Sequence, residues 1–139
     1  MSADDSTANE VLERLESEHA RLVGEFMDAW SARDVDRLVG LLADDVVYMV
    51  YEGGPTLNGP DEVRDVVGRF MERWQRIEFS VDRLHVVGPL AINERREEYD
   101  GKDGQADWRF FVAGLLVIKD GQIAIWRDYS LPGKQQVFD

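Results

Sequence analysis

An aspartate near the end of the chain has neighbours suited to acid–base chemistry. It is Asp128, within the run Ile123–Pro132, which follows an Asp-Gly turn signal and has the composition of a strand. Alternate residues of a strand share a face, so one face carries Ala124, Trp126, Asp128 and Ser130, and the other carries Ile123, Ile125 and Arg127. A lone carboxylate beside Trp126 is costly unless it is paired or used, whereas at a strand end that emerges into water it costs nothing. This stretch alone favours neither interpretation.

A second stretch, Ala91–Tyr99, carries many charges for a strand that the order of elements makes central. One face has Asn93, Arg95, Glu97 and Tyr99, and the other has Ile92, Glu94, Arg96 and Glu98. The second face is the more charged, so we expect the first to meet the helices. A buried arginine beside a carboxylate is expensive without further partners, and Asp128 could be that partner. The alternative is a solvated face whose cross-strand ion pairs contribute little.

The overall composition excludes several classes of function. The chain has 139 residues and a net charge of −12, from 28 acidic and 16 basic side chains. Nucleic acids and anionic membrane surfaces both require basic patches, so neither is expected as a partner. There are no cysteines, and His19 and His85 are too few for a typical zinc or non-haem iron site. No apolar run approaches the about 20 residues of a membrane span, and Met1–Ala8 does not resemble a signal peptide, so we expect a cytoplasmic protein.

The first half of the chain predicts three helices, from apolar residues at helical spacing. They are expected at Asn9–Arg33, at Val35–Leu42, and from Gly59 to about Trp74. Asp34 can cap the second helix, and Pro60 suits the first turn of the third. Residues 1–8 are expected to be a disordered lead-in.

The remaining segments predict strands, from alternating apolar residues and β-branched composition. These are Asp45–Tyr51, Ile77–Val87, Leu90–Tyr99, Trp108–Lys119 and Ile123–Ser130. The segment Glu52–Asn58 is expected to be a Gly/Pro loop, and Asp120-Gly121 to be a hairpin turn. Helices followed by a run of antiparallel hairpins predict one α+β domain, residues 9–139, in which the helices cover one face of a curved sheet.

Several short segments within about residues 20–130 match one known family together. They are Glu25-Phe26-Met27-Asp28-Ala29, Leu42-Ala43-Asp44-Asp45 leading into Tyr48, Glu94-Arg95, Gly114 and Trp126-Arg127-Asp128-Tyr129. On these residues the chain resembles the limonene-1,2-epoxide hydrolase family of the nuclear transport factor 2-like superfamily. The resemblance implies a cone-shaped α+β fold, with a curved mixed or antiparallel sheet and about three helices packed on its concave face.

The resemblance also implies roles for four residues at the bottom of the cone. Asp128 matches the base that activates water, Arg95 the bridging cation, and Tyr48 a tyrosine that helps to hold the water. Glu97 stands where the family has an aspartate acid, and is one methylene longer. Val50 stands where the family has an asparagine that also orients the water. Opening an epoxide with water needs only a base and an acid beside the substrate, so no metal and no organic cofactor is expected.

Eight residues match positions that line or support the family's pocket: Met27, Trp30, Phe70, Trp74, Tyr99, Phe110, Val112 and Trp126. Each of them, taken alone, could equally be plain core. As a set they predict a site rich in aromatic side chains, suited to a bulky or flat apolar substrate or largely filled by its own side chains.

Three functions remain open at this point. The first is a cofactor-independent epoxide hydrolase that acts on a small hydrophobic epoxide. The second is an isomerase, dehydratase or polyketide cyclase that uses Asp128 as acid and base, although ketosteroid-isomerase-like members place their base about where Val50 stands. The third is a non-catalytic module that binds a small molecule. A homodimer is also expected, because apolar side chains of the last two strands cannot all face the helices; these are Leu115, Val117, Ile123 and Ile125.

Overall fold

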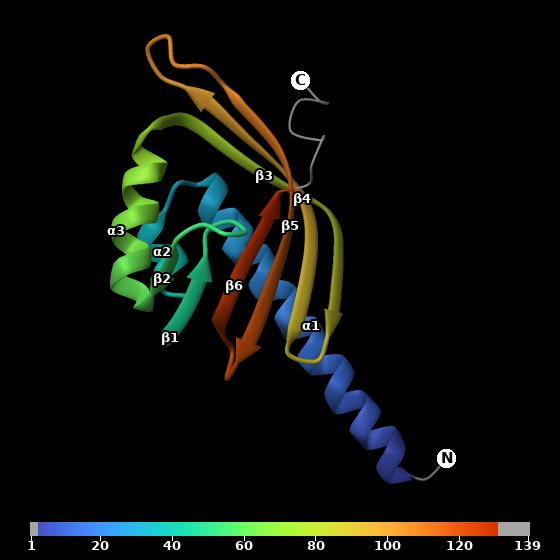
Figure 1. Ribbon diagram of the computed structural model, residues 1–139. Helices are drawn as coiled ribbons and strands as arrows, with labels where there is room; N and C mark the ends of the chain where they lie inside the picture. The colour runs from blue at the N-terminus through green and yellow to red at the C-terminus, as the bar shows by residue number, and fades with distance from the viewer. Residues whose placement is uncertain (1–2, 131–139) are drawn as a thin grey trace.

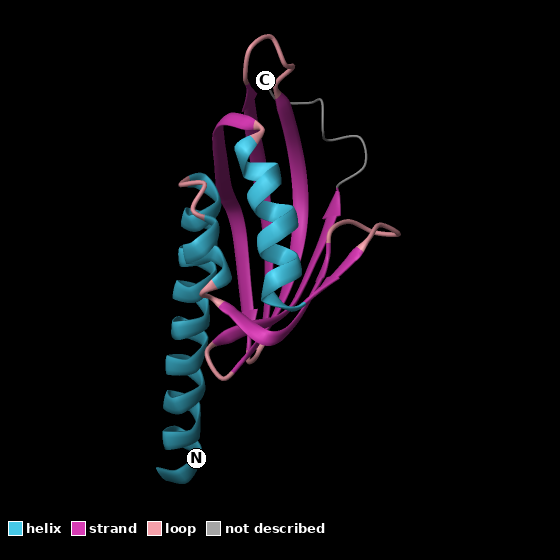
Figure 2. Cartoon of the chain, turned by 90° about the vertical axis from the view of Figure 1, so that its left-hand side faces the viewer, coloured by secondary structure: helices cyan, strands magenta, loops and turns pink. Residues whose placement is uncertain are grey.

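The computed structural model describes residues 3–130 (Figure 1). The chain begins with the long helix α1 (Ala3–Ser31), so residues 3–8, expected to be disordered, are helical. The N-terminal part of α1 extends beyond the end of the sheet (Figures 1 and 2), whereas its C-terminal part buries Phe26 and Trp30 in the core. Among the described helices, none combines the length and the apolar character needed to cross a membrane. The end of the predicted domain, residues 131–139, lies outside the described range.

Six strands form one curved, open sheet, in the order β2-β1-β6-β5-β4-β3. Their bounds are β1 (Leu42–Met49), β2 (Thr56–Asn58), β3 (Trp74–Val87), β4 (Leu90–Gly101), β5 (Trp108–Lys119) and β6 (Gln122–Ser130). All neighbouring pairs are antiparallel except β1 and β6, which run parallel, so the sheet is mixed. The helices α1 and α3 (Gly59–Glu72) cover its concave face (Figure 2). The predicted α+β architecture is confirmed.

Local signals in the sequence predicted two of the connections well. The predicted cap of α2 (Val35–Val39) is present, because an Asp34 side-chain oxygen accepts a hydrogen bond from the Arg37 backbone N–H at 3.0 Å. In the hairpin between β5 and β6, Asp120 and Gly121 have φ values of 52° and 75°. Positive φ at both central residues is the turn geometry that suits the right-handed twist of paired strands.

Several element boundaries differ from the prediction, and one short strand was not predicted. The helix α2 ends at Val39, and Leu42, predicted to close it, opens β1 instead, where it pairs with Ile123. Within the predicted loop, Thr56–Asn58 forms the short strand β2 against β1, and a strand this short has no alternation to detect. Trp74 is the first residue of β3, because α3 has already ended at Glu72.

An irregularity in β6 changes the face of one residue. Ile118 pairs with Ile123 but Val117 pairs with Ile125, so Ala124 is an extra residue in the ladder. Alternation is therefore interrupted, and Ile123 is fully buried, with 0% of its surface exposed, instead of lying on the outer face. Of the apolar residues expected to face outward, only Leu115, Val117 and Ile125 remain partly exposed.

The predicted inner face of β4 is confirmed. Asn93, Arg95, Glu97 and Tyr99 are all buried, whereas the alternate residues, from Ile92 to Glu98, are partly exposed. A row of polar side chains therefore runs along the inside of the sheet, beneath the helices. Burial of charge on this scale requires close pairing.

Candidate active site

Arg95 is the centre of the buried polar group. Only 2% of its surface is exposed. Its Nη2 lies 2.6 Å from Glu97 Oε2 and 3.0 Å from Asp128 Oδ1, so it bridges a carboxylate on β4 and one on β6. Nε also donates to Glu97 Oε2 at 2.7 Å, and Nη1 donates to Asn93 Oδ1 at 2.8 Å. Burial opposes the charge on the guanidinium, but the Asp128 and Glu97 carboxylates raise the pKa of Arg95 overall.

The bridge between β4 and β6 crosses the intervening strand at Gly114. This residue pairs with Asn93 on one side and with Asp128 on the other. A Cβ atom at this position would lie 2.9 Å from Asn93 Nδ2 and 3.0 Å from Asp128 Oδ1, and closer still to Arg95 Nη1. Only glycine leaves room for the Arg95 side chain to pass over β5. This explains physically why Gly114 is among the residues that the chain shares with the family it resembles.

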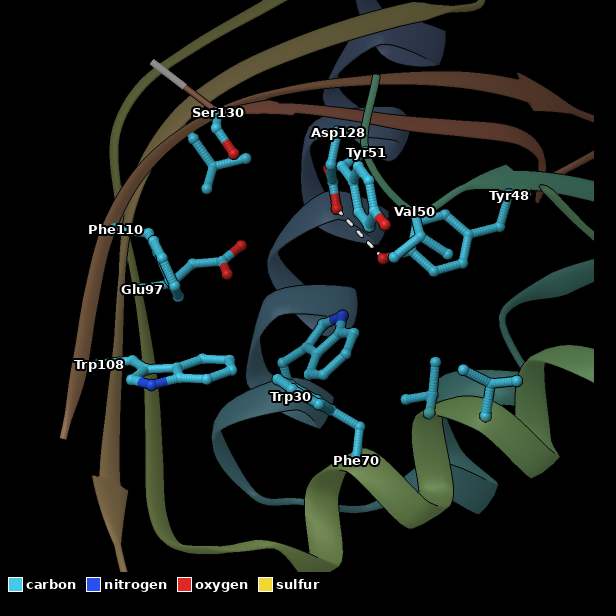
Figure 3. Close-up of a pocket in the computed structure, with 13 residues that line it drawn as sticks. Trp30, Tyr48, Val50, Tyr51, Phe70, Glu97, Trp108, Phe110, Asp128 and Ser130 are labelled. Carbon is cyan, nitrogen blue, oxygen red and sulfur yellow. Dashed lines mark hydrogen bonds between the residues drawn. The ribbon is translucent and has the colours of Figure 1, made fainter. Parts of the chain in front are cut away.

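Asp128 receives hydrogen bonds on one of its two oxygens. Trp126 Nε1 donates to Oδ2 at 3.0 Å, and the Tyr48 hydroxyl reaches the same oxygen at 3.4 Å (Figure 3). Oδ1 faces Arg95, but within the described residues no N–H or O–H is aligned to hydrogen-bond to it. Burial raises the pKa of Asp128 from its ordinary 3.8 to about 6, Arg95 opposes this, and the Glu97 charge adds to it.

Glu97 is held at both oxygens. Arg95 takes Oε2, and the Tyr99 hydroxyl donates to Oε1 at 2.5 Å. Burial raises the pKa of Tyr99 and of Tyr48. The Glu97 charge raises both further, and the Asp128 charge adds to the shift of Tyr48. Both phenols therefore stay protonated at neutral pH and act as hydrogen-bond donors.

An apolar cavity of about 310 Å³ opens onto these carboxylates (Figure 3). Its wall is made by residues of α1, α3, the sheet and the segment after β1: Trp30, Tyr48, Val50, Tyr51, Val66, Val67, Phe70, Glu97, Trp108, Phe110, Val112, Asp128 and Ser130. Glu97 and Asp128 enter from different strands, and the Glu97 carboxyl group points into the space (Figure 3). A volume of this size suits a small organic molecule.

Four of the eight predicted pocket residues line this cavity: Trp30, Phe70, Phe110 and Val112. The other four, Met27, Trp74, Tyr99 and Trp126, are buried in the core and are not among the lining residues. Two of these four act on the site indirectly, because Tyr99 donates to Glu97 and Trp126 donates to Asp128. Their rings fill the space between the helices and the sheet, which places only their polar atoms at the site.

Some lining residues were not predicted, although the sequence carried a signal for them. Trp108 shares a strand face with Phe110 and Val112, and Ser130 shares one with Asp128. Val66 and Val67 lie one turn before Phe70 on α3, Val67 on its buried side and Val66 at the edge of that side. Extending the strand alternation by one residue pair, and the helical periodicity by one turn, would have added all four to the predicted pocket residues. Within residues 3–130, no group of three or more metal-ligating side chains is placed to share an ion.

Comparison with known proteins finds similarity to epoxide hydrolases. The chain is 28% identical over 104 residues, 75% of its length and 67% of the relative's, to the epoxide hydrolase EphG of Mycobacterium tuberculosis. The solved structure of an M. tuberculosis epoxide hydrolase of the limonene-1,2-epoxide hydrolase-like type superposes with a TM-score of 0.76 at 27% identity, covering 86% of this chain and 87% of the other. The epoxide hydrolase/cyclase-like enzyme SalBIII, linked to pyran ring formation in salinomycin, shares the fold with a TM-score of 0.77 at 14% identity, over 86% and 95% of the two chains.

The family assignment comes from a match to a domain model. The model of the SnoaL-like domain matches residues 23–126, which include β1, β4 and most of β6 together with the C-terminal part of α1. Since this range is well over half of the chain, the protein belongs to the SnoaL-like domain family.

Proposed function

We propose that this protein is a cofactor-independent epoxide hydrolase that opens a small hydrophobic epoxide to a diol. The observation that carries the proposal is the buried chain Asp128–Arg95–Glu97 at the wall of an apolar cavity. Ring opening by water needs a base for the water and an acid for the ring oxygen, and the two must lie on either side of the substrate. The similarity to epoxide hydrolases at 27–28% identity supports the same reaction class.

In this mechanism Asp128 takes a proton from a water molecule. The pKa of Asp128, raised to about 6, makes it a stronger base than an ordinary aspartate while leaving it ionised at neutral pH. The Tyr48 hydroxyl, close to Oδ2, is placed to hold the same water. The Val50 side chain cannot hydrogen-bond to it, and the Tyr51 hydroxyl, also in the cavity wall, is the candidate to share this role with Asp128 and Tyr48.

Glu97 supplies the proton for the other half of the reaction. As the water oxygen bonds to one ring carbon, the carbon–oxygen bond breaks, and the ring oxygen takes a proton from the Glu97 carboxyl group. When both carboxylates are ionised, the cluster of Arg95, Glu97 and Asp128 has a net charge of −1. One proton shared by the two carboxylates makes the cluster neutral. The cycle closes when the proton gained by Asp128 replaces the one lost by Glu97.

A different acid–base reaction on the same site is the second candidate. Six of the lining side chains are aromatic: Trp30, Tyr48, Tyr51, Phe70, Trp108 and Phe110. Such a wall suits a flat polyketide-like substrate, which Asp128 could deprotonate for a cyclisation. Water addition to an epoxide and cyclisation differ in one observable, because only the first incorporates an oxygen atom from the solvent.

The experiment that tests the proposal uses this difference. Styrene oxide and limonene oxide are incubated with the protein in H₂¹⁸O, and the products are analysed by mass spectrometry. We expect diols with one labelled oxygen, formed well above the rate without protein. Absence of enzyme-dependent diol across a panel of apolar epoxides would contradict the proposal, and a cyclised product without label from a polyketide-like substrate would support the second candidate.

A further inference from the structure

The cavity wall contains a hydrogen-bond donor with nothing to donate to. Trp30 is 4% exposed, and its Nε1 has no hydrogen-bond partner among the described residues. Two further buried side-chain atoms of residues 6–130 share this condition, Trp74 Nε1 and Asp128 Oδ1. Unpaired buried donors are rare because they have lost their hydration without compensation. Of the two indoles, only Trp30 lines the cavity.

Neighbouring rings fix the direction of the Trp30 N–H. The indole stacks on Phe79 with a centroid distance of 4.9 Å and an interplanar angle of 17°. The rings of Trp126 and Phe70 meet it edge to face, at 5.9 and 6.2 Å. With aromatic rings on several sides, the indole has little freedom to turn toward another acceptor.

The fixed N–H points to the place where a ligand would react. Figure 3 shows the nitrogen edge of the indole turned into the cavity, toward the side where Asp128 and Tyr48 lie, with the Glu97 carboxyl group across the space. An indole N–H can only donate, so the group that satisfies it must be an acceptor. Both oxygens of Glu97 are already engaged by Tyr99 and Arg95. The other oxygen atoms of the wall belong to Tyr48, Tyr51, Asp128 and Ser130, and none of them accepts a hydrogen bond from the indole.

We infer that the Trp30 N–H donates to an oxygen atom of the ligand, so that the site selects apolar molecules carrying an acceptor oxygen beside the reacting carbon. The identity of this oxygen rests on the proposed function: in an epoxide it is the ring oxygen. A fixed donor then stabilises negative charge on the ring oxygen as the ring opens, before or while Glu97 delivers its proton. Trp30 thereby combines positioning of the substrate with selection against hydrocarbons of the same shape.

A pair of unreactive probes tests this without requiring turnover. 3-Phenyloxetane carries a small-ring ether oxygen and resists hydrolysis at neutral pH, and phenylcyclobutane has the same shape without the oxygen. We expect calorimetry to show that the wild-type protein binds the oxetane about fivefold to tenfold more tightly than phenylcyclobutane. This ratio of dissociation constants corresponds to the free energy of one neutral hydrogen bond. In Trp30→Phe, which keeps an aromatic ring at this position, the ratio falls below about twofold.

Trp74→Phe is the matched control, because it removes the other unpaired buried indole N–H, which does not line the cavity. It should keep the wild-type ratio. A ratio retained in Trp30→Phe, or no preference for the oxetane in the wild type, would overturn the inference. Should Trp30→Phe fold poorly, the indole N–H signals of the wild type give the same answer: the Trp30 proton moves downfield with the oxetane alone, and an unchanged signal overturns the inference. Diol formation is measured in a separate experiment. The proposed function can therefore be contradicted while the binding preference is observed, and the binding preference can be absent while diol is formed.

Discussion

Two clusters of ion pairs lie on opposite faces of β4, and they are built from the same residue types. The inner cluster places Arg95 between Glu97 and Asp128, and all three side chains are buried. The outer cluster, on β3, β4 and β5, consists of Arg76, Glu98, Asp100 and Arg109. Its two cations also pair with Glu78 and Asp107, so it too has one cation for every two carboxylates. It differs from the inner cluster in that its side chains are partly exposed.

The two clusters shift the pKa of their aspartates in opposite directions. A hydrogen bond from Arg76 lowers the pKa of Asp100 below its ordinary value. Burial raises the pKa of Asp128 to about 6, even though Arg95 lies 3.0 Å away. The difference shows that a nearby arginine does not by itself decide the charge of a carboxylate. Burial of Asp128 outweighs the guanidinium, and the Glu97 charge adds to the upward shift. A carboxylate with a pKa raised in this way is suited to act as a base near neutral pH.

Loss of the inner aspartate should have the largest effect. Asp128→Asn keeps the shape and can still accept a hydrogen bond, but its amide cannot take a proton from water. We expect turnover of an epoxide substrate to fall by about 10²–10⁴-fold, the contribution of a general base, while the apolar wall still binds ligand. Asp100→Asn is the matched control, and its steady-state rates should stay within about twofold, because an exposed pair contributes little. Equal rates for Asp128→Asn and the wild type would make the inner carboxylate structural.

Removal of the arginine should lower the free energy of unfolding far more in the inner cluster than in the outer cluster. Arg95→Ala leaves two buried carboxylates facing each other, and breaking a buried pair costs about 3–5 kcal/mol. Arg76→Ala in the outer cluster should cost under about 1 kcal/mol.

The loss in Arg95→Ala should also depend on pH. Without the guanidinium the folded-state pKa of Asp128, already raised to about 6, rises further above its unfolded value. The destabilisation is therefore small in acid and grows as the pH rises from the unfolded-state pKa to the folded-state pKa. Urea midpoints at pH 5 and pH 8 measure this. A variant as stable as the wild type at pH 8 would mean that Arg95 is solvated.

The space above Gly114 should be the next most sensitive feature. Gly114→Ala pushes a methyl group into Arg95, Asn93 and Asp128, and overpacking of this kind costs about 1–3 kcal/mol. We expect it to lower the free energy of unfolding and to impair turnover, because the bridge between β4 and β6 is displaced. Gly24→Ala is the control: nothing lies within 4 Å of its Cβ on α1, and alanine in a helix should stabilise by about 0.5–1 kcal/mol. Chemical denaturation compares the two.

The smallest effect concerns the apolar part of the outer face. Leu115, Val117 and Ile125 lie side by side across β5 and β6, and Ile92 and Tyr129 add to the exposed apolar surface. We expect a homodimer at micromolar concentration, measured by analytical ultracentrifugation. Val117→Glu should weaken it, and Val11→Glu, the same change on the exposed part of α1, should not. A monomeric wild type would contradict the expectation.

Much of the fold followed from local patterns, and the limits have physical causes. Alternation was enough to assign the inner face of β4, and the Asp-Gly pair was enough to place the last hairpin. The extra residue at Ala124 could not be predicted, because a bulge depends on the register of both neighbouring strands. Because the extra residue was not predicted, Ile123 was assigned to the outer face of β6, which is wrong.

The site was predictable in its charges and less so in its walls. The cost of burying charge pointed to Arg95 and Glu97, with Asp128 as a candidate partner, and the resemblance to a known family selected this arrangement. Which aromatic rings face the cavity depends on how the rings pack against one another. Trp74 and Trp30 are both buried tryptophans, yet only Trp30 faces the cavity, and nothing in their local sequence separates them.

The most direct test of this account is a titration of the two aspartates within one protein. ¹³C NMR of the side-chain carboxyl carbons follows Asp128 and Asp100 in the same sample, with Asp128→Asn used for assignment. We predict that Asp128 titrates near pH 6 and that Asp100 titrates below its ordinary 3.8. A midpoint for Asp128 at or below 3.8 would contradict the account, because the inner aspartate would then be an ordinary ion-paired carboxylate and too weak a base for the proposed reaction.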